Sequence, residues 1–168
     1  MKLLERKEVP VELTWDMTLL YKTEEEYESE LGVFQKKAAE LEGYKGKLNQ
    51  ADTIVACLKE YEQYLIMLDH LSHYASLPVS TDAYDTFARQ RLARFSAIAT
   101  EWAGKLSFIG SEIAEADASV IEEAMNQGGG SAGYLKEILR EKPHRLSAET
   151  EKVLTMLRNS LNAPYDIY

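Results

Sequence analysis

Three long stretches of the chain carry apolar residues at the three- and four-residue spacing of an amphipathic helix. The first follows Thr23-Glu24-Glu25-Glu26, a capping box in which the Thr23 hydroxyl accepts a backbone N–H and Glu26 reaches back. Gly43 and Gly46 predict where this helix ends. Because its apolar positions recur on one face, the pattern predicts one buried stripe. The stripe consists of Tyr27, Leu31, Phe34, Ala38 and Leu41.

Two more helices, each of roughly 25 residues and about 38 Å long, follow in the pattern. Asp52 is the predicted cap of the second, and Pro78 is the predicted end because proline cannot continue a helix. The third begins near Thr81 or Asp82 and ends between residues 107 and 110. The expected stripe of the second is Val55, Leu58, Leu65, Leu68 and Ala75 with Tyr61 and Ser72, and that of the third is Tyr84, Ala88, Arg91, Phe95, Ile98 and Trp102.

Shorter helices are predicted in the remainder of the chain. Ser119 and Glu122 suggest a second capping box, and Gly128 to Ser131 a flexible loop. A short helix over 134–141 is stopped by Pro143. The last predicted helix is capped by Ser147 and carries Val153, Leu154, Leu157 and Leu161.

The predicted fold class is all-α. No convincing run of alternating apolar and polar residues occurs, so strands are not expected. Short connections between long helices favour a long antiparallel helical hairpin or three-helix unit, with several shorter helices packed beside it. Residues 1–22 form an N-terminal arm, expected in extended or turn form, and residues 23–168 form one helical domain. No repeat of fixed period is visible, which excludes a solenoid.

Composition and charge narrow the classes of function. Of the 168 residues, 45% are apolar and 28% are charged, as in ordinary globular domains. The 19 basic residues are outnumbered by 28 acidic ones, and the longest basic pair, Lys36-Lys37, lies among glutamates. Nucleic-acid binding is therefore not expected. The chain has no apolar stretch long enough for a transmembrane helix and no signal-peptide core, so we expect a cytoplasmic protein without membrane contact.

The candidate metal ligands are too few for a site. Cys57 is the only cysteine, which excludes an internal disulfide and a cysteine-based zinc site. His70 and His73 are three residues apart on a predicted helix, but His144 is the only further histidine. The pair also lacks the glutamate that a helical metallopeptidase motif has between its two histidines. The spacing favours a surface or partly buried pair over a metal site.

Other candidate chemistry is equally incomplete. The glutamate runs lie at helix starts, where the helix dipole favours negative charge. Gly128 to Ser131 lacks the Lys-Ser/Thr of a phosphate loop, and Cys57 fits a small core residue. The ten tyrosines suit interfaces and packing at amphipathic boundaries alike; five of them, Tyr44, Tyr61, Tyr64, Tyr74 and Tyr84, lie on or beside the long helices. Composition and spacing alone indicate an acidic helical domain without a complete catalytic constellation.

Three segments, in order, resemble the N-terminal part of oligoendopeptidase F, a zinc metallopeptidase of the thimet-oligopeptidase-like group. The first is VPVELTWDMTLLY over 9–21 with TEEEY over 23–27. The second runs from SHYASL at 72–77 through Glu101 and KLSFI at 105–109 to Glu112-Ile113. The third is YLKEILREKPHRLS over 134–147, continuing to Glu151.

The resemblance implies a domain of a larger enzyme. The family's catalysis uses a His-Glu-x-x-His helix with a further glutamate ligand, which this sequence lacks, so no catalytic, cofactor-binding or metal-ligating residue is assigned. The expected function is a non-catalytic N-terminal domain that forms part of the wall or lid of a cavity for short peptides. Its expected partners are its own C-terminal catalytic domain, which would hold the zinc, and peptide substrates. The alternative is a free-standing helical protein–protein interaction module.

Overall fold

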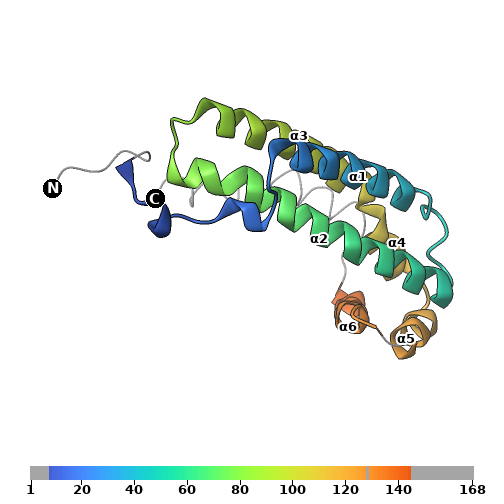
Figure 1. Cartoon of the computed structure of the whole chain (residues 1–168). Coiled ribbons are helices and arrows are strands. Elements are labelled where there is room, and N and C mark those ends of the chain that lie inside the picture. The colour runs from blue at the N-terminus through green and yellow to red at the C-terminus, as the bar shows by residue number, and fades with distance from the viewer. Residues whose placement is uncertain (1–7, 128, 145–168) are drawn as a thin grey trace.

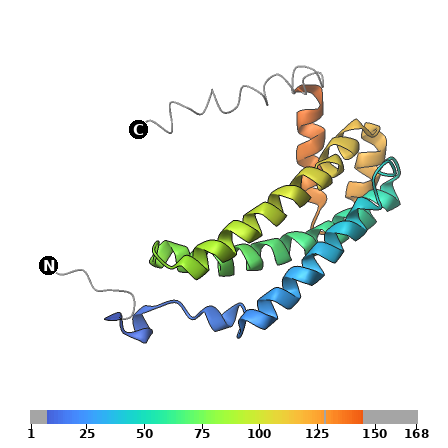
Figure 2. The same ribbon diagram turned by 90° about the horizontal axis from the view of Figure 1, so that it is seen from above.

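The computed structural model describes residues 8–127 and 129–144. Three long helices, α1 (Glu24–Glu42), α2 (Ala51–Thr81) and α3 (Thr86–Leu106), pack against one another along most of the molecule (Figures 1 and 2). Shorter helices α4 (Phe108–Glu115), α5 (Ala118–Asn126) and α6 (Ala132–Glu141) gather at one end, and single 3-10 turns form at Val11–Leu13, Met17–Leu19 and Lys142–His144. These described ranges contain no strand, so the predicted all-α class is confirmed.

Helix α1 forms as the sequence predicts. The Thr23 hydroxyl accepts a hydrogen bond from the Glu26 N–H at 3.3 Å. The Glu26 carboxylate, however, accepts from the Lys22 N–H at 2.7 Å, one residue before the position a standard capping box uses. All five residues of the predicted stripe are buried. The helix ends at Glu42 with Gly43 as its C-cap.

Helix α2 begins earlier than predicted and buries a different face. Its N-cap is Gln50, so the expectation that Asp52 caps it is wrong. The predicted stripe is partly wrong as well, because Leu65 is exposed and Leu68 only half-buried. Residues 64–68 are all apolar, and such a run has no period that identifies its inner face. The residues that the helix buries are Ala51, Ile54, Cys57, Leu58, Tyr64, Leu71 and Ala75.

Pro78 does not end α2, which continues to Thr81. Proline removes one N–H from the helix, but its own carbonyl can still accept hydrogen bonds. The Pro78 carbonyl accepts from the Asp82 N–H and from the Thr81 hydroxyl, each at 2.9 Å. These hydrogen bonds complete the last turn of the helix after the proline.

Helix α3 begins at Thr86, later than predicted. Asp85 is the N-cap, and its carboxylate accepts from the N–H groups of Phe87 at 2.9 Å and Ala88 at 3.0 Å. Tyr84 therefore lies in the α2–α3 turn and is 91% exposed, and its predicted place in the buried stripe is wrong.

The short helices are tied to the long ones by specific polar contacts. The Glu112 carboxylate of α4 accepts from the Gly46 N–H at 2.8 and 2.9 Å, which holds the α1–α2 connection. Lys142 donates to the carbonyls of Ala114 at 2.8 Å and Ala116 at 2.5 Å, where α4 ends. A cation there offsets the negative end of the helix dipole.

Two predictions about the shorter helices have different outcomes. The capping box of Ser119 and Glu122 is wrong, because α5 begins at Ala118 after Asp117 and no side chain caps it. The helix predicted after Ser147 lies outside the described residues.

Most of the five highlighted tyrosines serve packing in this structure. Tyr64 is buried and stacks on Phe34, with ring centroids 4.7 Å apart. Tyr74 is half-buried and stacks on Tyr27 at 5.0 Å, while Tyr44 and Tyr61 pack at the edge of the core.

Among the described residues, no helix is long and apolar enough to cross a membrane.

Candidate functional site

The histidine pair is placed on the exposed side of α2. The His73 ring Nδ1 lies 2.8 Å from the Asp69 carbonyl and 3.4 Å from its carboxylate, within the same helix. His70 is exposed, and the side chain of His144 lies outside what the structure describes. Across residues 8–127 and 129–144, no group of three or more His, Cys, Asp or Glu side chains could hold a metal ion. These residues do not fit a zinc site.

An apolar groove between α2 and the start of α6 is the clearest candidate binding site. It has a volume of about 220 Å³. Leu65 and Tyr134 on its two sides are each 42% exposed. We call it the α2–α6 groove; its lining residues are Leu58, Tyr61, Glu62, Leu65, Gly130, Ser131 and Tyr134.

Local sequence explains each side of the α2–α6 groove. Leu58 and Leu65 are two helical turns apart, so they lie on one face of α2. On the opposite side the backbone at Gly130 comes close to α2: a Cβ atom at this position would lie 3.0 Å from the Glu62 carboxylate. Gly129 has φ of +110°, a backbone conformation that favours glycine.

A second hollow lies on the other side of Tyr134. Its volume is about 350 Å³, and Ser107 and residues of α4 and α6 line it, among them Gly110 and Glu137. A Cβ atom at Gly110 would lie 3.3 Å from the Tyr134 hydroxyl. Tyr134 therefore separates the two hollows, and α6 carries residues that line both.

The chemistry of the α2–α6 groove suits binding. Leucine and tyrosine side chains can cover apolar groups of a ligand, and the Glu62 carboxylate and Ser131 hydroxyl offer polar contacts at its edge. The nearby thiol of Cys57 is fully buried, and burial raises its pKa to about 12, so it is held as an unreactive thiol.

Sequence reasoning did not find this groove as a site. Leu58, Leu65 and Tyr61 were predicted as core positions of one helix, and Tyr134 as the start of another. The available signal was the excess of apolar residues at 64–68 over what one buried face requires.

Comparisons with known proteins point to one family. The family model described as Oligopeptidase F matches residues 112–168. The oligoendopeptidase F homolog of Borreliella burgdorferi is 26% identical over 154 residues, 90% of this chain and 26% of the relative. The chain is similar to the N-terminal region of oligoendopeptidase F. The resemblance stated from the sequence is thus confirmed.

Two further relatives carry the same similarity. The plasmid-encoded oligoendopeptidase F of Lactococcus lactis subsp. cremoris is 23% identical over 97% of this chain and 28% of its own length. Oligopeptidase PepF of Bacillus subtilis is 24% identical over 91% of this chain and 23% of its own length. The chain therefore spans about a quarter of the length of these oligoendopeptidase F relatives. No solved structure matches the chain significantly.

Proposed function

We propose that this chain is the non-catalytic N-terminal domain of a zinc-dependent oligoendopeptidase that hydrolyses short peptides. The observation that carries the proposal is the similarity over 90–97% of the chain to proteins named oligoendopeptidase F. The sequence contains no His-Glu-x-x-His motif, and its described residues do not fit a zinc site. Zinc and the catalytic residues would therefore belong to a C-terminal domain outside this sequence.

The role proposed for this domain is to form part of the wall or lid of the substrate cavity. The α2–α6 groove supports this role, because it combines exposed apolar side chains with a carboxylate and a hydroxyl at its edge. An extended peptide offers matching groups, since its side chains can cover apolar surface while its backbone makes hydrogen bonds. The domain's partners would be its own catalytic domain and the peptide substrate.

The first test is to read the source gene past the Tyr168 codon. The proposal expects an open frame that reaches a His-Glu-x-x-His motif. A stop codon close behind Tyr168 would overturn it and would favour a free-standing helical interaction module.

The second test compares the isolated 168-residue chain with the product of the complete open frame. Only the longer protein should cleave a set of fluorogenic peptides, lose that cleavage to a chelator and contain stoichiometric zinc. Chelator-sensitive cleavage by the purified 168-residue chain would show that this domain is itself catalytic and would contradict the proposal.

A further inference from the structure

Exposed apolar side chains gather at the end of the molecule farthest from the α2–α6 groove. The N-terminal arm and the α2–α3 turn share this end (Figure 1). It holds five of the nine large hydrophobic side chains that are exposed in the described chain. We call them the distal surface: Leu13, Trp15, Leu19, Tyr84 and Phe87.

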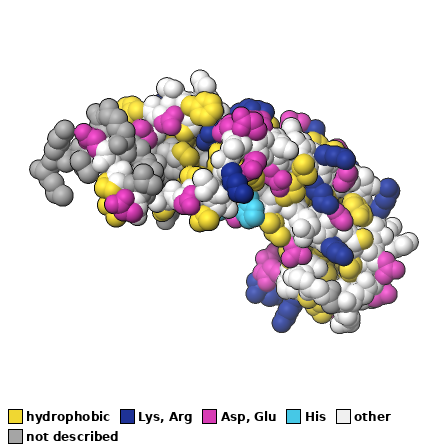
Figure 3. All heavy atoms as spheres, in the orientation of Figure 1, with side chains coloured by type: hydrophobic (Ala, Val, Ile, Leu, Met, Phe, Trp, Pro, Cys, Tyr) yellow, Lys and Arg dark blue, Asp and Glu magenta, His cyan; other side chains and the backbone are white. Residues whose placement is uncertain are grey.

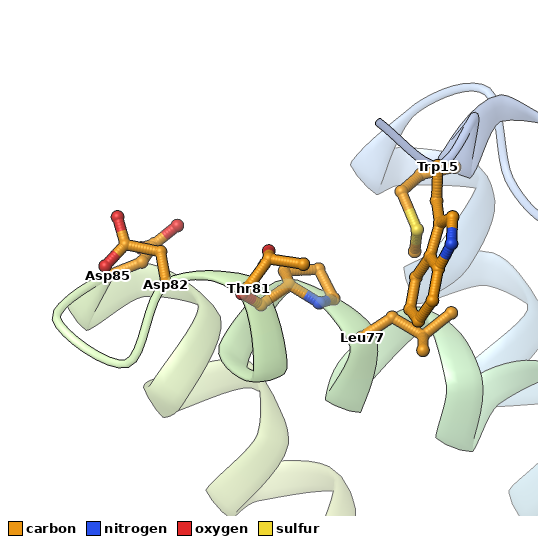
Figure 4. A pocket seen from close by; sticks show the side chains of 7 residues that line it. Trp15, Leu77, Thr81, Asp82 and Asp85 are labelled. Atoms are coloured by element: carbon orange, nitrogen blue, oxygen red, sulfur yellow. The ribbon is translucent and has the colours of Figure 1, made fainter. Parts of the chain in front are cut away.

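A pocket of about 120 Å³ lies within this end of the molecule. Trp15 and Met17 of the arm form one side, and the end of α2 forms the floor. In Figure 4 the Trp15 ring extends from the arm toward Leu77, while Asp82 and Asp85 lie at the other end of the pocket. Trp15 is still 60% exposed, so most of its ring remains available to a ligand.

Most of the charge around the distal surface is negative, although the Arg91 guanidinium, which is paired with Glu24, lies 5.0 Å from the centre of the Phe87 ring. Residues 8–21 and 77–88 contain no Lys, Arg or His, and Figure 3 shows acidic and hydrophobic side chains together at this end. The basic side chains on the same face lie mainly toward the middle and the opposite end. The acidic residues in the two segments are Glu8, Glu12, Asp16, Asp82 and Asp85.

Three of these carboxylates are fixed in position by the backbone. The Asp16 carboxylate accepts from the Thr18 N–H at 3.0 Å, and that of Asp82 accepts from the Tyr84 N–H at 2.9 Å. Asp85 caps α3. Among the described residues these hydrogen bonds all use one oxygen, Oδ1, so each carboxylate keeps acceptor capacity on its second oxygen.

We infer that the distal surface is a docking site for a peptide segment of a partner protein that carries Lys or Arg beside Leu or Phe. The apolar part of such a segment would cover Trp15 and the pocket, and its cations would face the carboxylates at the rim. A negative rim disfavours nucleic acid and anionic membranes, which carry charge of the same sign. The inference rests on this surface alone and is independent of the proposed peptidase function.

The first experiment uses Trp15 as its own reporter. The chain contains two tryptophans, so a Trp102→Phe variant leaves Trp15 as the only one. The probe is a short synthetic peptide of Leu, Lys and Ser, compared with the same peptide in which Gln replaces every Lys. We expect saturable binding of the Lys peptide, a blue shift of the Trp15 emission and a loss of affinity at high salt. The Gln peptide should bind about tenfold more weakly or worse.

Matched variants locate the binding. Asp16→Asn/Asp82→Asn/Asp85→Asn removes three charges from the rim, but each asparagine keeps an oxygen for the backbone hydrogen bond. We expect about a tenfold loss of affinity with an unchanged circular dichroism spectrum. Glu115→Gln/Glu122→Gln/Glu123→Gln removes three exposed charges from the α4–α5 end and should change affinity by less than about twofold.

Four results would overturn the inference. They are the absence of saturable binding, equal binding of the Gln peptide, and equal losses in the two triple variants. The fourth is a tenfold or greater gain of affinity on deletion of residues 1–7, the sequence MKLLERK, because it would identify the chain's own N-terminus as the occupant.

Discussion

Arg91 of α3 binds Glu24 of α1 through two hydrogen bonds, from Nε to Oε1 at 3.0 Å and from Nη2 to Oε2 at 2.5 Å. The same guanidinium lies 4.8 Å from the centre of the Tyr74 ring on α2 and 5.0 Å from that of Phe87. One side chain thus contacts all three long helices. The Arg91 side chain is only 12% exposed, so these contacts are partly shielded from water.

Replacing Arg91 should destabilise the three-helix unit more than replacing a similar arginine nearby. Arg91→Ala should lower the free energy of unfolding by about 2–3 kcal/mol, because it leaves Glu24 unpaired and removes the cation–π contacts. Arg94 also makes two hydrogen bonds to a glutamate, Glu28, but its side chain is 59% exposed. Arg94→Ala should therefore cost less than about 1 kcal/mol. Urea unfolding measures both, and equal losses would contradict the role assigned to Arg91.

Removing the hydroxyl of Tyr27 tests the packing of the same region. Tyr27 is 1% exposed, and its hydroxyl has no hydrogen-bond partner among the described residues. Because an unpaired buried hydroxyl costs free energy, Tyr27→Phe should raise the free energy of unfolding by about 0.5–1.5 kcal/mol. Tyr27→Leu should lower it, since the stacking of the ring on Tyr74 is lost. Thermal unfolding of both variants separates the contribution of the hydroxyl to stability from that of the ring. A destabilised Tyr27→Phe variant would show that the hydroxyl has a hydrogen-bond partner.

Alkaline pH should destabilise the fold through its buried tyrosines. Burial raises the pKa of Tyr27 and that of Tyr64 from 10.0 to about 12. The folded chain thus holds these protons more tightly than the unfolded chain. The resulting stability is fully present below pH 10 and is lost as pH rises toward 12.

The measurement is urea unfolding just below pH 10 and at intervals toward pH 12. The free energy of unfolding should fall over this range in the unmodified chain. A Tyr27→Phe/Tyr64→Phe double variant should lose less over the same range, because it lacks the two titrating groups. Identical pH dependence in the two proteins would show that other groups control the alkaline transition.

How much of the fold the sequence predicts depends on how clearly each helix separates its faces. In α1, mostly polar residues surround the stripe from Tyr27 to Leu41, and every predicted core residue is buried. In α2, the apolar run at 64–68 leaves the inner face ambiguous, and tertiary packing selects Tyr64 and Leu71 over Leu65. Propensity and period are local signals, whereas the choice of face depends on where α1 and α3 lie.

The face of α2 can be tested directly. Leu71→Ala should lower the free energy of unfolding by about 2–5 kcal/mol, because it opens a cavity at a fully buried position. Leu65→Ala removes the same atoms from an exposed position and should cost less than about 1 kcal/mol. Chemical denaturation of the two variants decides between the register observed here and the one predicted from the pattern, which would reverse the order.

The candidate site was beyond sequence reasoning for a geometric reason. The α2–α6 groove joins residues 58–65 to residues 130–134, and no local pattern records that these segments meet. Gly129 and Gly130 did predict a loop, but the close approach of residue 130 to the Glu62 carboxylate is visible only in the structure.

If the proposed function is correct, the α2–α6 groove binds part of the peptide substrate. The protein to test is the product of the complete open frame. Leu65→Ser and Tyr134→Ser remove apolar surface that a bound peptide would cover. If this surface contributes about 1–2 kcal/mol to peptide binding, KM should rise by roughly 5- to 30-fold with kcat nearly unchanged. Val33→Ser is the control, because Val33 on α1 is also about half exposed but does not line the groove. An equal rise of KM in all three variants, or a loss of kcat alone, would show that the α2–α6 groove does not bind the substrate.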